Sequence, residues 1–415
     1  MKNTGFYSAF KDIWMLDGVR TPMVDYCGTL GGVSPTDMGI KVAREIIKRT
    51  GIHAEDIDSV ITGNMAPGDF DQFFLPRHIG LYAGVRQEVP ALMAQRICGT
   101  GFELFRQAGE QIQSGAANVA LCVGTESMTR NPIASFVHRT GFKLGSPVEF
   151  KDYMWEALLD PAAKINMIQT AENLAVKYGI TREEVDQFAS NSFAKAVAAQ
   201  QAGYFDGEIV PVISEKFELE GYQTRSIKLP SKVESIKSDT HARISPVEVL
   251  AKLRSVYPNG VQTGGNSSAL VDAAAAAIVA SGEYVRTHGK SVLARIVGGA
   301  VVGVPPEIMG IGPAPAIRLL LEKNGLKLDD IDRFEINEAQ GAQTLAVQKE
   351  LGLDPSKLNV NGGATALGHP LAATGVRLTI TVARELQKSK KRYGVASACI
   401  GGGQGIALLI ENPNA

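Results

Sequence analysis

The chain has 415 residues, 45% of them hydrophobic, and a formal net charge of −1. At roughly 150 residues per domain, this length predicts two or three domains with a large core. The nearly balanced charge gives no electrostatic reason to expect binding to nucleic acid or to a membrane surface, and it leaves open a local basic patch for phosphates.

The N-terminal residues and the cysteines indicate a compartment. Lys11 and Asp12 fall where a signal peptide would need a continuous apolar run, so we expect no export signal. Cysteines at positions 27, 98, 122 and 399 form no C-x-x-C pair and are too sparse for a disulfide scaffold. The sequence therefore predicts free thiols and a cytoplasmic location.

The first predicted unit in the chain is a helix that ends at Gly51, an acidic loop at 55–58, and an apolar strand that ends near Asn64. A second copy of this unit begins at Arg318. The matching positions are Arg44 and Arg318, Gly51 and Gly325, residues 55–58 and 329–332, and Asn64 and Asn337.

The next predicted helix follows the stretch "AQRICGTG" at 94–101, because Phe102, Phe105 and Ile112 recur at helical spacing. Cys98 then lies at a helix N-terminus, where unpaired N–H groups and the helix dipole favour the thiolate, the nucleophilic form of cysteine. The alternative is a small buried hydrophobic residue, and position alone does not decide between them.

The repeat continues beyond this helix. Thr100–Gly101 match Thr374–Gly375, and the strand at 121–124 matches 398–401, so that Cys122 corresponds to Cys399. Four matches in the same order indicate one supersecondary plan that occurs twice. Strands that alternate with helices in each copy predict an α/β fold with buried sheets.

An insertion separates the two copies. Residues 129–258 contain irregular polar segments on either side of a helical stretch at 182–203. We expect a first half made of 1–128 and 259–290, a loop domain at 129–258, and a second half at 291–415. Loops carried on a rigid scaffold are where ligand contacts tend to collect.

The longest apolar stretch, "AAAAAIVA" at 273–280, is far shorter than a membrane span of about 20 residues. It is predicted to be a buried helix, and Asn266, Ser267 and Ser268 before it fit a helix cap.

Three glycine-bearing stretches occur in the second copy: "EINEAQGAQ" at 335–343, "NGGATALGHPLAATG" at 361–375, and "CIGGGQG" at 399–405. His369 stands just before a helix, where it is either structural or a base kept neutral by the helix dipole. The last stretch resembles a phosphate loop weakly, and we interpret Gly402 and Gly403 as a tight turn after a strand.

The motifs "CGTG", "NEA", "GGATALGHP" and "CIGGGQG", in this order, resemble those of the thiolases, and the likeness runs from "VRTP" at 19 to "LLIE" at 408–411. The resemblance implies a five-layered αβαβα fold of two similar halves with an inserted loop domain that covers coenzyme A. It implies acyl-CoA and CoA as substrates, no prosthetic group and no metal. A homodimer or tetramer, with or without an accessory subunit, is also implied.

The resemblance also implies a role for each site residue. Cys98 carries the acyl group as a thioester and His369 takes its proton. Cys399 is the acid or base at the α-carbon of acetyl-CoA. One oxyanion lies against the backbone N–H groups of Cys98 and Gly401, and the enolate lies against His369 and a water held by Asn337.

For coenzyme A, the stretch at 263–276 resembles the family's pantetheine-contacting turn, with Gly264 and Ser268 as contacts. Cys27 and Cys122 match no motif for chemistry and are predicted to be structural.

Some residues depart from the family pattern. Gln95 and Thr100 are mild changes, but Gln340 stands where an aromatic residue is expected, and Asn166, Ile168 and Gln169 alter the segment before "TAEN". With Phe73, Phe74 and Arg77 upstream of the nucleophile, these changes suggest a bulky acyl group with a ring and a carboxylate, such as a benzoylsuccinyl thioester. The alternative is that the two phenylalanines fill an interface between halves or subunits.

Two other classes of function stay open at this point. A decarboxylating ketoacyl synthase is related, but that family uses two histidines, or His and Asn, beside its cysteine, and Cys399 argues against it. A non-catalytic acyl-CoA or lipid carrier would be expected to lose Cys98, His369 or Cys399, and all three are present.

Overall fold

The computed structural model describes residues 5–415 and contains two similar groups of strands. The first group is β2 (Ile13–Arg20), β4 (Ser59–Gly63), β5 (Ala91–Ala94), β6 (Val119–Ser127) and β15 (Val271–Ser281), with the short β3 (Val24–Asp25) beside β15. The second group is β1 (Gly5–Ala9), β16 (Ala294–Gly303), β17 (Arg333–Ile336), β18 (Tyr393–Ile400) and β19 (Gln404–Glu411). The strand order is β17-β18-β19-β16-β2-β15-β6-β4-β5, and the two groups join where β16 pairs with the start of β2.

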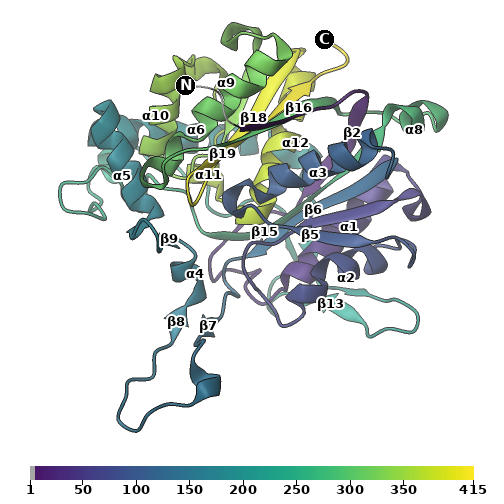
Figure 1. Ribbon diagram of the computed structural model, residues 1–415, viewed down its shortest axis with the longest axis horizontal. Coiled ribbons are helices and arrows are strands. Elements are labelled where there is room, and N and C mark those ends of the chain that lie inside the picture. The colour runs from purple at the N-terminus through teal and green to yellow at the C-terminus, as the bar shows by residue number, and fades with distance from the viewer. Residues whose placement is uncertain (1–4) are drawn as a thin grey trace.

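Helices cover these sheets on both sides and fill the space between them (Figure 1). The main helices are α1 (Pro35–Thr50), α2 (Leu75–Tyr82), α3 (Thr100–Gln113), α9 (Pro313–Asn324), α10 (Gly341–Leu351) and α12 (Leu371–Ser389). The central pair α3 and α12 lies between the sheets, α1 and α2 cover the first sheet, and α9 and α10 cover the second. This is the predicted αβαβα arrangement.

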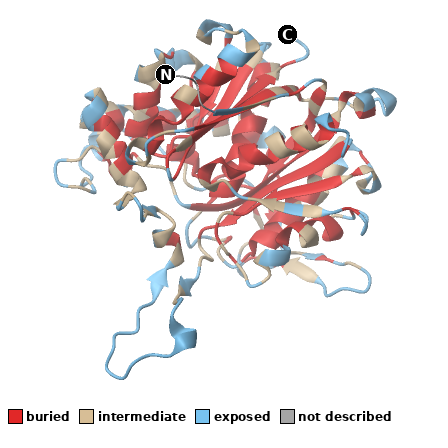
Figure 2. Cartoon of the chain, in the orientation of Figure 1, coloured by how far each residue is buried: buried red, intermediate tan, exposed pale blue. Residues whose placement is uncertain are grey.

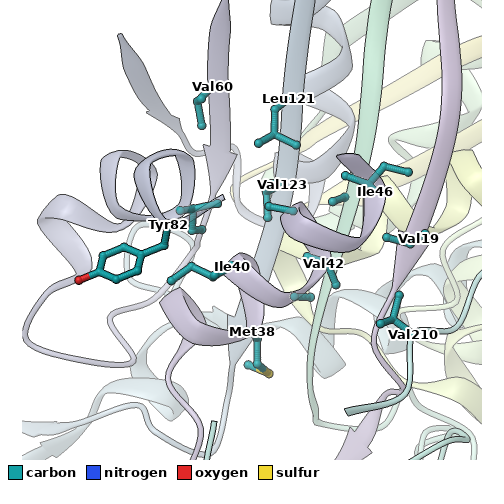
Figure 3. Close-up of a cluster of buried hydrophobic side chains, with 14 of the residues drawn as sticks. Val19, Met38, Ile40, Val42, Ile46, Val60, Tyr82, Leu121, Val123 and Val210 are labelled. Atoms are coloured by element: carbon teal, nitrogen blue, oxygen red, sulfur yellow. The ribbon is translucent and has the colours of Figure 1, made fainter. Parts of the chain in front are cut away.

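The three largest hydrophobic clusters are separated by the sheets. Figure 3 shows the first, in which Ile40, Val42 and Ile46 of α1 face Val60 and Leu121 of the first sheet. The second lies between the sheets around the central helices, and the third packs α9 and α10 on the second sheet. Each buried aliphatic side chain contributes roughly 1.5–3 kcal/mol, and Figure 2 shows that both the strands and the helices packed on them supply such side chains.

The prediction of a helix at 273–280 is wrong. These residues belong to β15, which pairs with β2 on one side and β6 on the other. A strand buried on both faces has a continuous apolar run, and such a run does not differ in periodicity from a buried helix. Its alanines leave room for α1 on one face and the central helices on the other.

The predicted repeat is present in the fold, because α1, β4, α3 and β6 correspond to α9, β17, α12 and β18. Gly51 and Gly325 end the first helix of each copy with φ of 60° and 65°. The central helices cross at the matched glycines: a Cβ on Gly101 would lie 2.7 Å from the nitrogen of Gly375, and a Cβ on Gly375 would meet the nitrogen of Phe102. Two helix backbones can approach this closely when neither has a side chain at the contact.

The insertion at 129–258 carries two longer helices, α5 (Met167–Tyr178) and α6 (Arg182–Gln201), among short elements. The short elements are β7 (Ile133–Ala134), β8 (Lys151–Asp152), α4 (Tyr153–Glu156), β9 (Leu159–Asp160), β10 (Ile165–Asn166), β11 (Val212–Ile213), β12 (Glu215–Phe217), β13 (Arg225–Ile227), β14 (Ser235–Ile236) and α7 (Val247–Leu250). Two further short helices, α8 (Gly282–Thr287) and α11 (Ala364–Leu367), follow it. The β7–β8 hairpin projects away from the body and is largely exposed (Figures 1 and 2). The rest of the insertion is divided: α5 and α6 lie beside α10, whereas β13 lies beside α1.

Candidate active site

A cavity of about 450 Å³ opens between the two halves and the insertion. Cys98 comes to it from the start of α3, and His369 from just before α12. Gly264 and Ser268 lie in its wall on the segment that leads into β15. The sequence-predicted nucleophile, base and coenzyme A contacts are therefore in one cavity.

The turn that carries Cys98 is strained and tightly held. Ile97 has φ of 44°, in the left-handed region that a β-branched residue rarely adopts. The Thr100 hydroxyl donates to the Ile97 carbonyl at 2.7 Å and accepts from the Arg96 N–H at 2.8 Å. Thr100 thereby fixes the turn on both sides of the nucleophile, and this gives the threonine of "CGTG" a structural role.

The expectation that the helix start stabilises the Cys98 thiolate is not met by the resting site. Burial raises the pKa of the Cys98 thiol to about 11, although the N–H groups of Gly401 and of Cys98 itself oppose the shift. Desolvation disfavours the charged form, and here it outweighs the helix N-terminus. Cys98 is therefore a thiol at neutral pH and needs a base. The two N–H groups that lower its pKa converge on the sulfur.

His369 is buried and oriented by one side chain. Its Nδ1 lies 2.6 Å from the Thr374 hydroxyl oxygen, and that hydroxyl donates its single proton to the Pro370 carbonyl at 3.0 Å. The imidazole must then be the donor at Nδ1, which leaves Nε2 with a free lone pair. Nε2 is buried and has no hydrogen-bond partner within residues 5–415. Burial, and after it the charge of Arg377, lowers the pKa of His369 to about 3, so the ring is neutral.

Cys399 and Gly401 stand at the end of β18. Burial first, and then the neighbouring Cys98, raises the pKa of the Cys399 thiol far above its usual range. Gly402 and Gly403 have φ of 79° and 89° and form the turn into β19, as predicted. A Cβ on Gly403 would also collide with the Val304 carbonyl oxygen. This turn fixes the N–H of Gly401 against Cys98.

Asn337 and its repeat partner Asn64 have opposite surroundings. The Asn64 amide donates to the Thr125 carbonyl at 2.9 Å and accepts from Gln72 at 2.9 Å. Both amide atoms of Asn337 are buried without a hydrogen-bond partner in the described part of the chain. A buried amide without partners costs about 1–3 kcal/mol, so Asn337 is suited to bind a group outside the chain.

The departures from the family pattern divide into two groups. Gln340 and Asn166 line the cavity, and the Gln340 Oε1 is buried without a partner among the described residues. Phe73 and Phe74 are 83% and 61% exposed, and Arg77 donates to the backbone carbonyls of Gln87 and Val89.

The interpretation that Phe73, Phe74 and Arg77 recognise a ring and a carboxylate is therefore wrong, because all three lie outside the cavity. A benzoylsuccinyl thioester is not favoured.

The capping role of residues 266–268 also needs correction, because a strand and not a helix follows them. Asn266 instead holds a turn: its Oδ1 accepts from the Thr263 N–H at 2.7 Å, and its Nδ2 donates to Asp186 at 2.8 Å. Ser268 donates its N–H to the Ala339 carbonyl at 3.1 Å. The turn thereby joins the cavity wall to the "NEA" segment.

One buried carboxylate that the sequence analysis missed joins the parts of the site. Glu126, at the end of β6, accepts N–H groups from Met65 at 3.1 Å, Ala66 at 3.2 Å and Ala372 at 3.0 Å. Burial raises the pKa of Glu126 to about 7 against these hydrogen bonds. Ala372 is in the first turn of α12, so Glu126 holds the helix that follows His369. In the sequence it is one acidic residue after a strand, which predicts nothing specific.

Two features are absent from residues 5–415. No group of three or more His, Cys, Asp or Glu side chains is placed to hold a metal ion. No helix in this range combines the length and the apolar composition that a membrane crossing requires.

Comparison with known proteins agrees with this site. Residues 13–283 match the model of the thiolase N-terminal domain, and residues 290–412 match that of the thiolase C-terminal domain. The chain is 44% identical to the mitochondrial 3-ketoacyl-CoA thiolase of Bos taurus, with 97% of this chain and 98% of the relative covered. It is 39% identical to the beta-ketoadipyl-CoA thiolase of Acinetobacter baylyi over 97% and 99%.

A crystal structure of human mitochondrial 3-ketoacyl-CoA thiolase in complex with CoA has a TM-score of 0.90 and 42% identity, and covers 96% of this chain and 98% of that one. The fold and the cavity thus define an acyltransferase that uses coenzyme A as a substrate. The chain belongs to the thiolase family.

Proposed function

We propose that this thiolase forms or cleaves a 3-oxoacyl-CoA through an acyl-Cys98 intermediate. The observation that carries the proposal is the shared cavity of Cys98 and His369, which is lined by a neutral thiol and by a neutral imidazole whose Nε2 is free. The names of the bovine and Acinetobacter relatives support a 3-oxoacyl substrate.

In the first half of the reaction, His369 Nε2 takes the proton of the Cys98 thiol. The thiolate attacks the thioester carbonyl, and the N–H groups of Cys98 and Gly401 stabilise the oxyanion. Collapse of the intermediate breaks the bond to the sulfur of CoA, and the leaving thiolate takes the proton back from His369. Because burial raises the pKa of the Cys98 thiol and lowers that of His369, this proton transfer is unfavourable in the resting site and is coupled to the attack on the thioester, whose oxyanion the two N–H groups stabilise.

In the second half, His369 Nε2 takes the proton of the Cys399 thiol, and the Cys399 thiolate then removes a proton from the α-carbon of acetyl-CoA. The enolate oxygen is stabilised by the protonated His369 and by a water held by Asn337, whose unpartnered amide supports this role. The α-carbon attacks the acyl group on Cys98, the bond between that carbonyl carbon and the Cys98 sulfur breaks to release the 3-oxoacyl-CoA, and the Cys98 thiolate takes the proton from His369. Thiolysis is the same sequence in reverse.

We further propose that Gly264 and Ser268 contact the pantetheine arm and that residues 129–258 act as the loop domain over coenzyme A. Both Gly264 and Ser268 lie in the cavity wall. Free cysteines support a reducing compartment, and we propose the cytoplasm.

A homodimer or tetramer, with or without an accessory subunit, is also proposed. Its support is the open edge of β5 and the exposed Phe73 and Phe74 nearby.

The test is peptide mapping after brief exposure of the purified protein to acetyl-CoA. We expect the added acetyl mass on Cys98. A Cys399→Ala variant should still be acetylated on Cys98, yet it should not exchange the α-protons of acetyl-CoA with deuterium from the solvent. Acetyl mass on another cysteine, or normal exchange by the variant, would contradict the assignments.

A further inference from the structure

We propose that Arg96 is a positioning residue that holds the two N–H groups of the oxyanion site in register, through a hydrogen bond to Gln404. Its Nη1 donates to the Gln404 Oε1 at 3.0 Å, and its Nε donates to the Glu103 Oε2 at 3.0 Å. Arg96 is two residues before Cys98, and Gln404 is three residues after Gly401. The inference rests on the proposed function, because it assigns a role in stabilising the acylation intermediate.

The two N–H groups come from different halves of the molecule. Cys98 lies on the turn before α3, whereas Gly401 lies on the hairpin turn between β18 and β19. Apolar packing joins the turns, since a Cβ built on Gly401 would lie 3.6 Å from the side chain of Ile97. Apolar contacts are not directional, so they allow the turns to slide. A hydrogen bond from a guanidinium fixes direction as well as distance.

The guanidinium of Arg96 is itself anchored. Glu103 is buried in the first turn of α3, where it also accepts hydrogen bonds from Arg106 and Gln107. Burial alone would raise the pKa of Glu103, but the hydrogen bonds from these two residues and the charges of Arg106 and Arg96 lower it, so the carboxylate stays charged. The guanidinium of Arg96 therefore connects the Glu103 carboxylate to the hairpin of β18 and β19. Its hydrogen bond to Glu103 fixes the orientation of the planar group.

Gln404 passes this restraint to the turn. It is the first residue of β19, and its backbone pairs with Ile400 on one side and Gly303 on the other. Movement of the Gln404 backbone relative to Arg96 is therefore movement of the hairpin that carries Gly401.

Acyl transfer and alkylation of the Cys98 sulfur depend differently on the two N–H groups. Acyl transfer from a thioester creates an oxyanion, so it depends on the alignment of both N–H groups, and a misplacement of about 1 Å can cost on the order of 100-fold. Alkylation of Cys98 by iodoacetamide forms no oxyanion and uses the same two N–H groups only to stabilise the thiolate. Loss of the Arg96–Gln404 bond should therefore slow acylation by tenfold or more and slow alkylation by a clearly smaller factor.

The experiment is a double-mutant cycle with Arg96→Met, Gln404→Leu and the double variant, measured by rapid-quench acetylation of Cys98 by acetyl-CoA and by iodoacetamide alkylation of Cys98. Arg286→Met is the control, because Arg286 pairs with Asp12 at the surface and makes no hydrogen bond to Glu103 or Gln404 among the described residues. We expect each single variant to lose acetylation, the double variant to lose no more than the worse single variant, and the control to acetylate at the native rate.

Equal loss of acetylation and alkylation would indicate a general disturbance of the turn and overturn the inference, as would native acetylation by both single variants. Additive losses would also overturn it, because they would mean that the two side chains act separately. If one variant does not fold, the other single variant decides between these outcomes. Failure of the native protein to form acetyl-Cys98 would instead refute the proposed function.

Discussion

The tautomer of His369 depends on the Thr374 hydroxyl, and Thr374→Val tests this dependence. Valine keeps the shape of threonine and removes the acceptor that lies 2.6 Å from Nδ1. The buried imidazole then has an unpaired Nδ1–H, or it shifts its proton to Nε2 and ceases to be a base. An unsatisfied buried donor costs about 1–3 kcal/mol, which corresponds to about 5- to 150-fold in the acylation rate if the whole penalty falls on the productive tautomer.

The assay is rapid-quench formation of acetyl-Cys98, with the free energy of unfolding measured in urea alongside. Thr374→Ser is the matched control, since serine keeps the hydroxyl between Nδ1 and the Pro370 carbonyl. We expect Thr374→Val to lose rate and Thr374→Ser to retain most of it. Native acetylation by Thr374→Val, or an equal loss in both variants, would refute the argument from the tautomer.

Two further predictions concern buried groups away from the reacting atoms. Glu126 has a pKa of about 7 in the folded protein against a usual value of 4.5. The folded state therefore holds the carboxyl proton more tightly than the unfolded state does. The stability that this proton contributes is present at low pH and is lost as the pH rises from 4.5 through about 7. The free energy of unfolding, measured by urea denaturation, should fall between pH 5 and pH 8 in the native protein, and Glu126→Gln should reduce this fall by up to about 3 kcal/mol. The same fall in the variant as in the native protein would contradict this prediction. Gly375→Ala should destabilise the protein by about 1–3 kcal/mol or more and slow acylation, because the added methyl group meets the backbone of α3, and a native Tm would show that the crossing can relax.

The sequence predicted the parts of the fold that depend on local pattern and on repetition. The helix that ends at Gly51 and the one that ends at Gly325 were found because glycine adopts positive φ at a helix end. The strand at 271–281 was mistaken for a helix because a strand buried on both faces has no alternation of apolar and polar residues.

For the site, the motifs located Cys98 and His369, but the direction of the Cys98 pKa was predicted wrongly. A helix start can be read from the sequence, whereas the degree of burial that dominates the pKa depends on the packing of three separate segments. The partners of the site residues were missed for the same reason. Glu126 reaches Ala372 across 246 positions, and Arg96 reaches Gln404 across 308.

The close crossing of α3 and α12 constrains the sequences of the two halves at the crossing and leaves them free to differ elsewhere. When two identical units pair about a twofold axis, a residue on the axis meets its own copy, and Gly101 against Gly375 is such a pair within one chain. A side chain at either position would meet the other backbone, so the two glycines constrain each other and neither can be replaced alone without cost. The strand ends away from the axis carry no such mutual constraint. There the first half has Asn64 hydrogen-bonded to Glu126, whereas in the second half both amide atoms of Asn337 have no partner among the described residues.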